Sequence, residues 1–439
     1  MTDKAHASPT KQFFIHMITR DITLDACILD LMDNCIDGAN RQINKRTSSI
    51  TDEGRYSGYW AKVLIGRDGF AIQDNCGGIP VQEAIDYAFH FGRRPDSPQQ
   101  SLYGIYGIGM KRAMLKMGNE IVVQSSTSQD AFQVSIDVEE WEKKDPEDWD
   151  FDLERKEISS PGTSISIKKL HKDIGEELAD RVFQTQLKET IARDYSFMLQ
   201  KGFRVFLNDV PVTPYQFKLR ESDMFKPIRA KYDFSPEISY EILAGLAGVP
   251  PDDNEASLRH EDVDYHGWFI ACNDRIVLAA DKSARTVWGD EGFPVWHPQY
   301  NGFMGIVLFQ AKDTSELPWT TTKRDIDLTA PLYRQAVLKM KEVTKQWIAY
   351  TNMRRDNVQQ AKKNELQAIL RPITEIAARG QMEMPQISSA PRVEMARVSY
   401  SKPKEDVLKV AEALGNRNMA YKDVGSETFD YFLEKRVES

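Results

Sequence analysis

Apolar positions recur at helical spacing early in the chain, and alternating and glycine-rich segments follow. Leu24, Ile28, Leu31, Met32, Cys35 and Ile36 form one stripe, which predicts a helix that Asp21 or Thr23 could cap. Residues 70–80 read FAIQDNCGGIP, an alternating strand that ends at Asp74 and is turned by Gly77 and Gly78. Residues 102–113 read LYGIYGIGMKRA, in which glycines open a predicted helix from Met110 to Met117.

Strand patterns dominate the middle of the chain. A hairpin-like pair of apolar runs covers residues 203–212, and further strands are expected at 240–247, 268–280 (with a turn at Asn273-Asp274) and 302–310, with an acidic loop at 252–264. We therefore expect an α/β fold of the α+β sandwich kind in two successive modules, with a boundary near residue 215.

The last part of the chain is predicted to be helical. A long helical pattern covers residues 332–370, with an excess of Lys and Arg that indicates either a nucleic-acid groove or, as we favour, a solvated helix face. A packing helix for a dimer or a partner is also open. Residues 372–402 have the composition of a linker, and two short amphipathic helices are expected at 405–414 and 426–436, as a small docking element. The organisation predicted is an arm (1–20), two α/β modules (21–214 and 215–331), a helical segment (332–371), a linker (372–402) and a C-terminal element (403–439).

Composition narrows the class of protein. The chain has 439 residues and a formal net charge of −9, which opposes nucleic-acid binding over the whole surface. Its 4 cysteines form no CxxC pair, so we expect free thiols and neither a disulfide framework nor a zinc knuckle. No apolar run is long enough to cross a bilayer, and we expect a cytoplasmic protein.

The first helix carries the first candidate chemistry. Asp30 and Asn34 are one helical turn apart and therefore share a face. A carboxylate that accepts a proton from water, beside an amide oxygen that ligates a hard cation, suits phosphoanhydride cleavage. The plain alternative is an amphipathic helix with a solvated polar face.

The glycine segments carry the second candidate chemistry. Gly104, Gly107 and Gly109 precede a helix that starts with Lys111, and converging backbone N–H groups at a helix start attract phosphate. Either segment alone is also compatible with a flexible turn or an ordinary helix start. Lys111, in turn, would ordinarily be solvent-exposed. The order of acid-amide helix, Asp-turn and glycine segment is far more restrictive.

In that order the segments resemble the N-box and the two glycine boxes of the GHKL superfamily of ATPases, which bind ATP in a Bergerat fold. Residues 160–168, reading SPGTSISIK, are similar to the later Gly-Thr strand of that fold. The resemblance is closest to the MORC-like and bacterial ATP-binding branch, covers residues 12–170 most strongly and extends to about residue 335 as a transducer-like second domain.

The resemblance implies a role for each matching residue. Asp30 would polarise the attacking water, Asn34 would hold Mg²⁺, Asp74 would accept a hydrogen bond from the adenine amino group, and Thr163 would hold a bridging water. Gly78 would let the backbone approach the nucleotide. The phosphate lid would comprise Gly104, Gly107, Gly109 and Lys111, and the remaining nucleotide-binding positions would be Asp37, Ile79, Ile108 and Met110.

Two departures and one rival acid qualify this assignment. Asp30 stands where most catalytic relatives have Glu, which makes hydrolysis less secure than binding because one missing methylene moves the carboxylate back. Cys76 replaces the first glycine of its box, although Gly77 can supply the turn. Asp33 points toward a different neighbour from Asp30, and we assign it a structural role.

The second module contributes one more candidate. Residues 317–323, reading LPWTTTK, resemble the transducer loop from which a lysine reaches the terminal phosphate, so Lys323 is the expected phosphate sensor. The plain alternative is a lysine in an exposed loop. The arm at residues 1–20 would cross to a partner subunit when ATP is bound.

The resemblance thus implies Mg²⁺-dependent ATP binding and slow hydrolysis that drive lid closure and homodimerisation, in a clamp or switch that could act on DNA in genome maintenance or phage defence. The C-terminal element could bind a protein partner. The alternative is a non-hydrolysing, nucleotide-gated scaffold or a chaperone-like protein. A histidine kinase is disfavoured because only His6 and His16 precede the first helix.

Overall fold

The computed structural model describes residues 9–43, 50–92, 107–251, 265–320, 323–385 and 398–436. The chain divides into two units, Met1–Ser388 and Ser389–Ser439, and we describe each by itself. The fold is a mixture of helices with several sheets, which confirms the expected α+β class. No helix in the described ranges is both long enough and apolar enough to cross a membrane.

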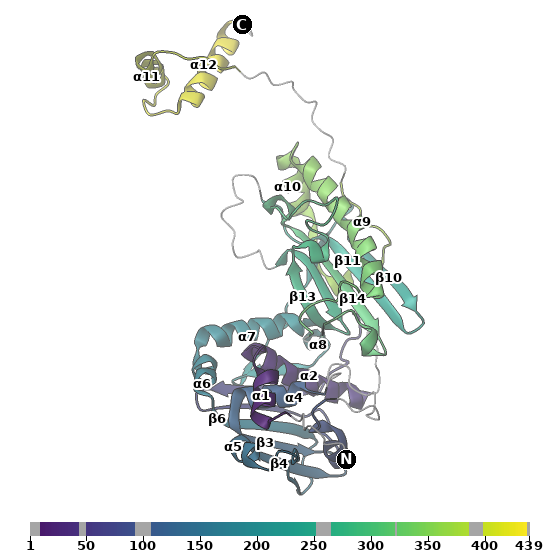
Figure 1. Ribbon diagram of the computed structural model, residues 1–439. Coiled ribbons are helices and arrows are strands. Elements are labelled where there is room, and N and C mark those ends of the chain that lie inside the picture. Colours follow the sequence, from purple (N-terminus) through teal and green to yellow (C-terminus); the bar gives the residue numbers. More distant parts are fainter. Residues whose placement is uncertain are drawn as a thin grey trace, which may run out of the picture. The chain divides into compact units, whose positions relative to one another are not determined.

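An eight-stranded sheet forms the base of the first module (Figure 1). Its strands are β1 (Trp60–Gly66), β2 (Gly69–Asp74), β3 (Gly118–Ser126), β4 (Ala131–Asp137), β5 (Leu153–Arg155), β6 (Gly162–Leu170), β7 (Arg204–Leu207) and β8 (Val210–Pro211). They lie in the order β5-β4-β3-β6-β2-β1-β7-β8. Only the β1–β7 pair is parallel among these described strands.

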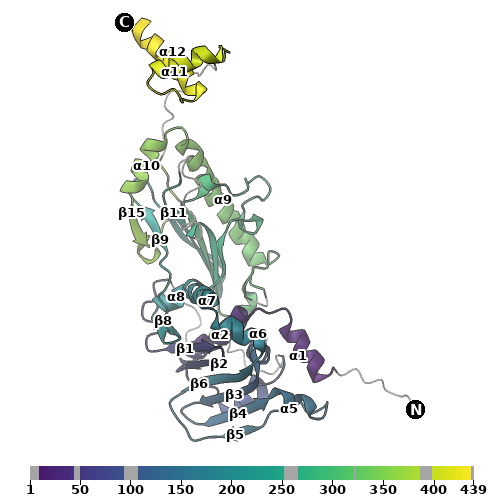
Figure 2. The same cartoon turned by 90° about the vertical axis from the view of Figure 1, so that its left-hand side faces the viewer.

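The helices of this module gather on one face of the sheet (Figures 1 and 2). They are α1 (Lys11–Thr19), α2 (Leu24–Ile43), α3 (Val81–Glu83), the π-helix η1 (Ala84–Ala88), α4 (Gly109–Met117), α5 (Val138–Lys143), α6 (Lys172–Ala179), α7 (Arg181–Asp194) and α8 (Ser196–Gln200). The apolar stripe of α2 is buried as its spacing predicts, and it packs on the inward-facing residues of the strands. Residues 1–8 of the expected arm lie outside the described residues. The rest of the arm contains α1, which packs on its own module: the Lys11 ammonium donates to the Trp141 carbonyl at 3.0 Å.

A second sheet follows in the same unit, in the order β10-β11-β14-β12-β13. Its strands are β10 (Ile228–Ser235), β11 (Ile238–Leu246), β12 (Gly267–Cys272), β13 (Arg275–Asp281) and β14 (Phe303–Ala311), and short 3-10 turns lie at η3 (Ala284–Thr286), η4 (Pro298–Tyr300) and η5 (Thr314–Glu316). Helix α9 (Pro331–Arg354) covers one face, where the indole N–H of Trp268 donates to the Thr344 hydroxyl at 3.3 Å. Gly305 makes room for that indole, because a Cβ there would lie 2.4 Å from a Trp268 ring atom.

The structure differs from the sequence expectation at the helical segment and the linker. The pattern over 332–370 is not one helix: α9 ends at Arg354, and α10 (Val358–Gln367) restarts after Asn357, whose side chain accepts from the Gln360 N–H at 3.3 Å. Part of the expected linker belongs to the second module. There β15 (Ile369–Pro372) pairs with β9 (Lys218–Glu221), η6 (Ile373–Glu375) follows, and isolated bridges tie residues 379 and 383 to β10 and its preceding turn.

The C-terminal unit contains two helices, α11 (Lys404–Ala413) and α12 (Tyr421–Arg436). Both expected helices are present, and α12 begins five residues earlier than the pattern at 426 indicated. Ala411 and Val424 are buried where the helices meet, while Phe429, Tyr431 and Phe432 are exposed.

Candidate nucleotide-binding site

A polar row interrupts the apolar inner face of the large sheet at one end. Ile72 of β2 pairs with Ile165 of β6, and both side chains are buried beneath the helices. Because the two strands are antiparallel, Asp74, two residues after Ile72, and Thr163, two residues before Ile165, lie at the same end of the pair and on the same face. Ser125 of β3 pairs with Thr163, so it extends the row. The sheet therefore presents a carboxylate and two hydroxyls side by side.

Asp74 is held by hydrogen-bond donors in a half-buried position. The Cys76 backbone N–H donates to its Oδ1 at 2.7 Å. Burial raises the pKa of Asp74 to about 6, while hydrogen bonds from the Cys76 N–H, the Cys35 thiol and the Thr163 N–H act in the opposite direction. The result is a half-buried acid with a raised pKa at the end of the sheet.

Ser125 and Cys35 are site residues that sequence reasoning missed. The Ser125 hydroxyl lies 2.9 Å from the Thr163 hydroxyl and accepts the Ile79 backbone N–H at 2.8 Å. The alternation of Ile121 and Val123 predicts that residue 125 faces inward, and this was the available signal. Cys35 contributed only to an apolar stripe, and nothing in that pattern indicates its contact with Asp74.

Gly78 is fixed by a close approach of two backbone segments. It has φ +72°, and a Cβ at this position would lie 2.0 Å from the Ser126 carbonyl oxygen. A side chain is therefore excluded both by conformation and by space. Ile79 follows directly, and its N–H reaches Ser125 as described above, so the glycine turn is docked on the polar row.

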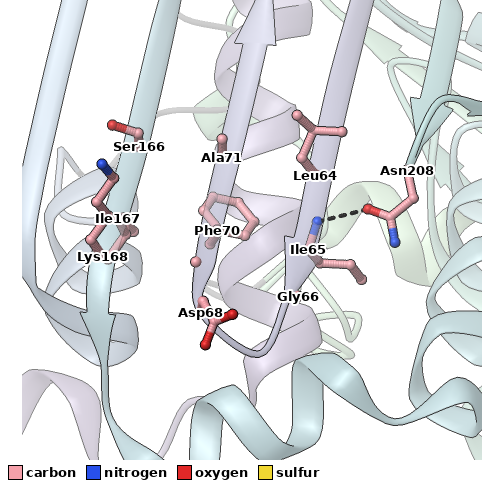
Figure 3. Close-up of a pocket in the computed structure, with 11 residues that line it drawn as sticks. Leu64, Ile65, Gly66, Asp68, Phe70, Ala71, Ser166, Ile167, Lys168 and Asn208 are labelled. Carbon is pink, nitrogen blue, oxygen red and sulfur yellow. Dashed lines mark hydrogen bonds between the residues drawn. The ribbon is translucent and has the colours of Figure 1, made fainter.

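A cavity of about 470 Å³ opens beside this row, lined in part by Asp74, Ser125, Gly162 and Thr163. Its size falls within the range of small-molecule sites, roughly 300–1,000 Å³. A second cavity, of about 370 Å³ and shown in Figure 3, is lined by Leu64, Ala71 and Ser166 among others, and contains none of the sequence-predicted site residues. We therefore place the candidate site at the Asp74 end.

Asp30 of α2 meets the start of α4. A guanidinium nitrogen of Arg112 lies 2.6 Å from Asp30 Oδ2. A Cβ on Gly109 would lie 3.2 Å from the same oxygen, so glycine allows α4 to begin against the carboxylate. Gly107, Ile108 and Met110 lie at this helix start as expected, whereas Gly104 falls outside the described residues.

Lys111 does not face the acid. Its side chain is buried, and the ammonium donates to the Ala88 carbonyl at the end of η1 at 2.9 Å. Burial lowers the pKa of Lys111 to about 7. A contact between Lys111 and a phosphate would require this side chain to leave Ala88.

Asn34 and Asp37 lie on α2, half-buried and buried respectively. In the described ranges no cluster of three or more His, Cys, Asp or Glu residues could hold a metal ion by itself. Mg²⁺ commonly takes one or two protein ligands and completes its shell with water and phosphate oxygens. A single amide oxygen from Asn34, beside a helix start suited to phosphate, fits that mode of binding.

Lys323 lies on the neighbouring acid rather than on Asp30. Its ammonium is 2.6 Å from Asp33 Oδ2, and the Arg275 Nε is 3.2 Å from Asp33 Oδ1. The Tyr195 hydroxyl also donates to Asp33, at 2.8 Å. Burial alone would raise the pKa of Asp33, but the two cations bring it below the ordinary value. Asp33 thus has the structural role expected of it, as the anchor of a buried ion cluster between the modules.

Comparison with known proteins found a family that resembles part of the chain. Residues 22–172 match the family described as histidine kinase-, DNA gyrase B-, and HSP90-like ATPase. No curated protein matches the chain. The matched range contains Asp30, Asp74, Gly109 and Thr163, the residues that the fold brings to the helix-covered side of the sheet. The match supports the assignment of residues 22–172 to the GHKL superfamily of ATPases.

Proposed function

We propose that the polar row at the end of the large sheet binds the adenine of ATP. The observation that carries this proposal is the alignment of Asp74, Thr163 and Ser125 beside a cavity of about 470 Å³. An ionised Asp74 accepts a hydrogen bond from the adenine amino group, and the hydroxyls of Thr163 and Ser125 supply positions for a bridging water. Gly78 lets the backbone come close to the base, and Ile79 and Asp37 complete the surroundings.

In this proposal the phosphates bind at the start of α4. Backbone N–H groups at a helix N-terminus attract anions, and Gly107, Ile108, Gly109 and Met110 place that terminus against Asp30. Gly104 and Lys111 belong to the same lid. Mg²⁺, held by Asn34 together with phosphate oxygens and water, would neutralise charge on the phosphates.

Hydrolysis then needs a base, and Asp30 is the residue in position. A water oxygen bonds to the terminal phosphorus, the bond from that phosphorus to the ADP oxygen breaks, and Asp30 takes the proton of the water. Lys323 senses the terminal phosphate from the second module, and nucleotide-dependent lid closure drives dimerisation. The ion pair between Lys323 and Asp33 supports a sensor role for this lysine, because Asp33 is the neighbour in sequence of Asn34, the proposed Mg²⁺ ligand.

The test is ATP affinity and phosphate release for the wild type and for Asn34→Ala, with Asn352→Ala as the control. Asn352 is an exposed asparagine on α9, so its replacement makes the same chemical change on a helix away from the site. We expect turnover in the wild type and the control and its loss in Asn34→Ala at an unchanged melting temperature. Equal turnover in all three proteins would contradict the assignment.

One observation favours the alternative of a nucleotide-gated scaffold that does not hydrolyse ATP. Asp30 is shorter than glutamate and is tied to Arg112, which could keep it from acting as a base. Tight ATP binding without phosphate release by the wild type would establish this alternative.

DNA is our candidate for the clamped polymer, by resemblance to MORC-like proteins. Some basic residues of 332–370 are already engaged within the protein, since Lys341 pairs with Asp290 at 2.7 Å and the buried Arg354 with Glu365 at 2.8 Å. We therefore expect DNA affinity at fixed low salt to depend on ATP-driven closure rather than on this segment. Affinity that is the same with and without ATP would exclude a clamp on DNA.

A further inference from the structure

The pair formed by Arg112 and Asp30 joins two elements that are far apart in sequence. Arg112 lies on α4, one turn after Gly109 and on the same helix face, while Asp30 lies on α2. The 2.6 Å contact is largely shielded from water, because the side chains are 22% and 11% exposed. A charge-assisted hydrogen bond in such a setting is stronger than a surface ion pair.

The guanidinium is only partly used by this contact. One terminal nitrogen reaches Asp30, whereas the Arg112 Nε is buried and has no hydrogen-bond partner in the part of the chain that the structure describes. A buried donor without a partner is costly, and a ligand that fills its hydrogen bond recovers that cost. The fork geometry of a guanidinium matches two oxygens of one phosphate.

We propose that Arg112 is a catalytic residue that exchanges partners, pairing with Asp30 in the nucleotide-free protein and with the terminal phosphate when ATP binds. This inference rests on the proposed function. In the free protein the Arg112 guanidinium occupies one carboxylate oxygen of Asp30, the proposed general base. The terminal phosphate carries more negative charge than a carboxylate and draws the guanidinium away, so Asp30 becomes able to accept a proton only when there is ATP to cleave.

The same exchange gives the site a preference for ATP over ADP. Arg112 contributes binding free energy only to the nucleotide that has a terminal phosphate, and part of that free energy is spent on breaking the pair with Asp30. Removing Asp30's charge should therefore tighten ATP binding through Arg112 while abolishing hydrolysis.

The experiment measures the affinities of a non-hydrolysable ATP analogue and of ADP by calorimetry for the full chain, together with phosphate release. Variants are Arg112→Gln, Arg112→Lys, Asp30→Asn and the double variant, with Lys116→Gln as control because it removes one positive charge from the same helix, one turn farther on. For Arg112→Gln we expect analogue affinity to fall about 10- to 100-fold, with ADP affinity within about twofold of the wild type. Arg112→Lys should recover part of the loss, and Lys116→Gln should match the wild type.

The double variant separates partner exchange from simple repulsion. If Asp30 competes for Arg112, Asp30→Asn tightens analogue binding and this gain disappears once Arg112 is Gln. The inference fails, while the proposed function stands, if the tighter analogue binding of Asp30→Asn persists in full in the double variant. It fails in the same way if Arg112→Gln binds both nucleotides as the wild type does. Failure of the wild type to bind either nucleotide would overturn the proposed function and this inference with it. ADP binding also reports whether each variant is folded.

Discussion

At the scale of single residues, Asp74 links the burial of the site to pH. Its pKa is raised from an ordinary 3.8 to about 6, so ionising it costs more in the folded than in the unfolded chain. Its contribution to stability is therefore fully present below pH 4 and is lost as pH rises through 6. Asp74→Asn, which stays neutral, should gain stability relative to the wild type by about 1–3 kcal/mol between pH 4 and pH 7.

Chemical unfolding of the nucleotide-free proteins at several pH values measures this difference. The change with pH, rather than the difference at one pH, isolates the ionisation from any constant loss of hydrogen bonds to the Cys76 and Thr163 N–H groups. Asp68→Asn, in the β1–β2 turn, is the control and should show no such trend. A pH-independent difference for Asp74→Asn would mean that the carboxyl is not desolvated as the structure indicates.

Residue-level prediction from sequence succeeded where the backbone imposes the choice. The turn at Gly78 and the end of β2 at Asp74 follow from alternation and from glycine, both of which are local. Arg112 and Cys35 could not be placed in this way, because their partners, Asp30 and Asp74, lie on other elements. Pairing of side chains across elements depends on how helices pack, which a single sequence does not state.

At the scale of elements, the ion cluster at Asp33 fixes α2 to the second module. Asp33 receives Lys323, Arg275 of β13 and the Tyr195 hydroxyl, all in buried positions. Asp33→Ala would leave two buried cations without this carboxylate, and we expect a loss of about 3–5 kcal/mol in the free energy of unfolding. The control Asp21→Ala, in an exposed pair with Arg20, should leave the free energy of unfolding close to that of the wild type.

Urea denaturation of both variants provides the comparison. Because the two cations hold the pKa of Asp33 below 3.8, the contribution of the cluster is present above that pH and is lost at more acidic pH. The penalty for Asp33→Ala should therefore shrink as pH falls below about 4. Equal, small penalties for both variants at neutral pH would show that the cluster does not join the modules energetically.

Helices and strands were predicted accurately where the apolar residues follow one clear periodicity. The prediction failed within the highly charged segment 332–370, where the sequence does not reveal that one helix ends and another begins. The spacing of α2 and the alternation of β11 and β14 predicted those elements to within a few residues. The apolar and charged positions of 332–370 read as one helix, but the cap at Asn357 lets α10 turn back so that Glu365 reaches Arg354 and Tyr350. That return is a tertiary preference, and helical periodicity contains no information about it.

At the scale of the whole molecule, the two units should be energetically separate. The C-terminal unit begins at Ser389 and has its own helix pair, in which Ala411 and Val424 are buried. A chain that ends at Ser388 should keep its melting temperature within about 2 °C and its ATP affinity within about twofold, as differential scanning calorimetry and titration would show. A large loss of stability would reveal that the C-terminal helices support the first unit.

Within the first unit, five ion pairs among the described residues join the modules: two at Asp33, a third between Arg275 and Asp194 at 3.1 Å, and two more. Besides the Asp33 cluster, Lys201 pairs with Asp274 at 2.7 Å in a buried position and Arg324 pairs with Asp25 at 2.8 Å. Recruitment of Lys323 by a terminal phosphate would take one cation from Asp33 and leave Arg275 in place. The joint between the modules would then be weakened by one ion pair without leaving Asp33 as an unpaired buried carboxylate, which is what a phosphate-dependent switch requires.

Lys323→Met tests this coupling, because Arg275 remains to neutralise Asp33 and the fold should persist. We expect unchanged ADP affinity, at least a tenfold loss of ATP turnover, and loss of the dimer that a non-hydrolysable analogue induces in the wild type, measured by sedimentation. Lys312→Met removes a lysine from an exposed pair with Glu237 and should change none of these. If Lys323→Met turns over ATP and dimerises like the wild type, Lys323 serves only the Asp33 cluster, and the signal from the terminal phosphate must reach the second module through α2.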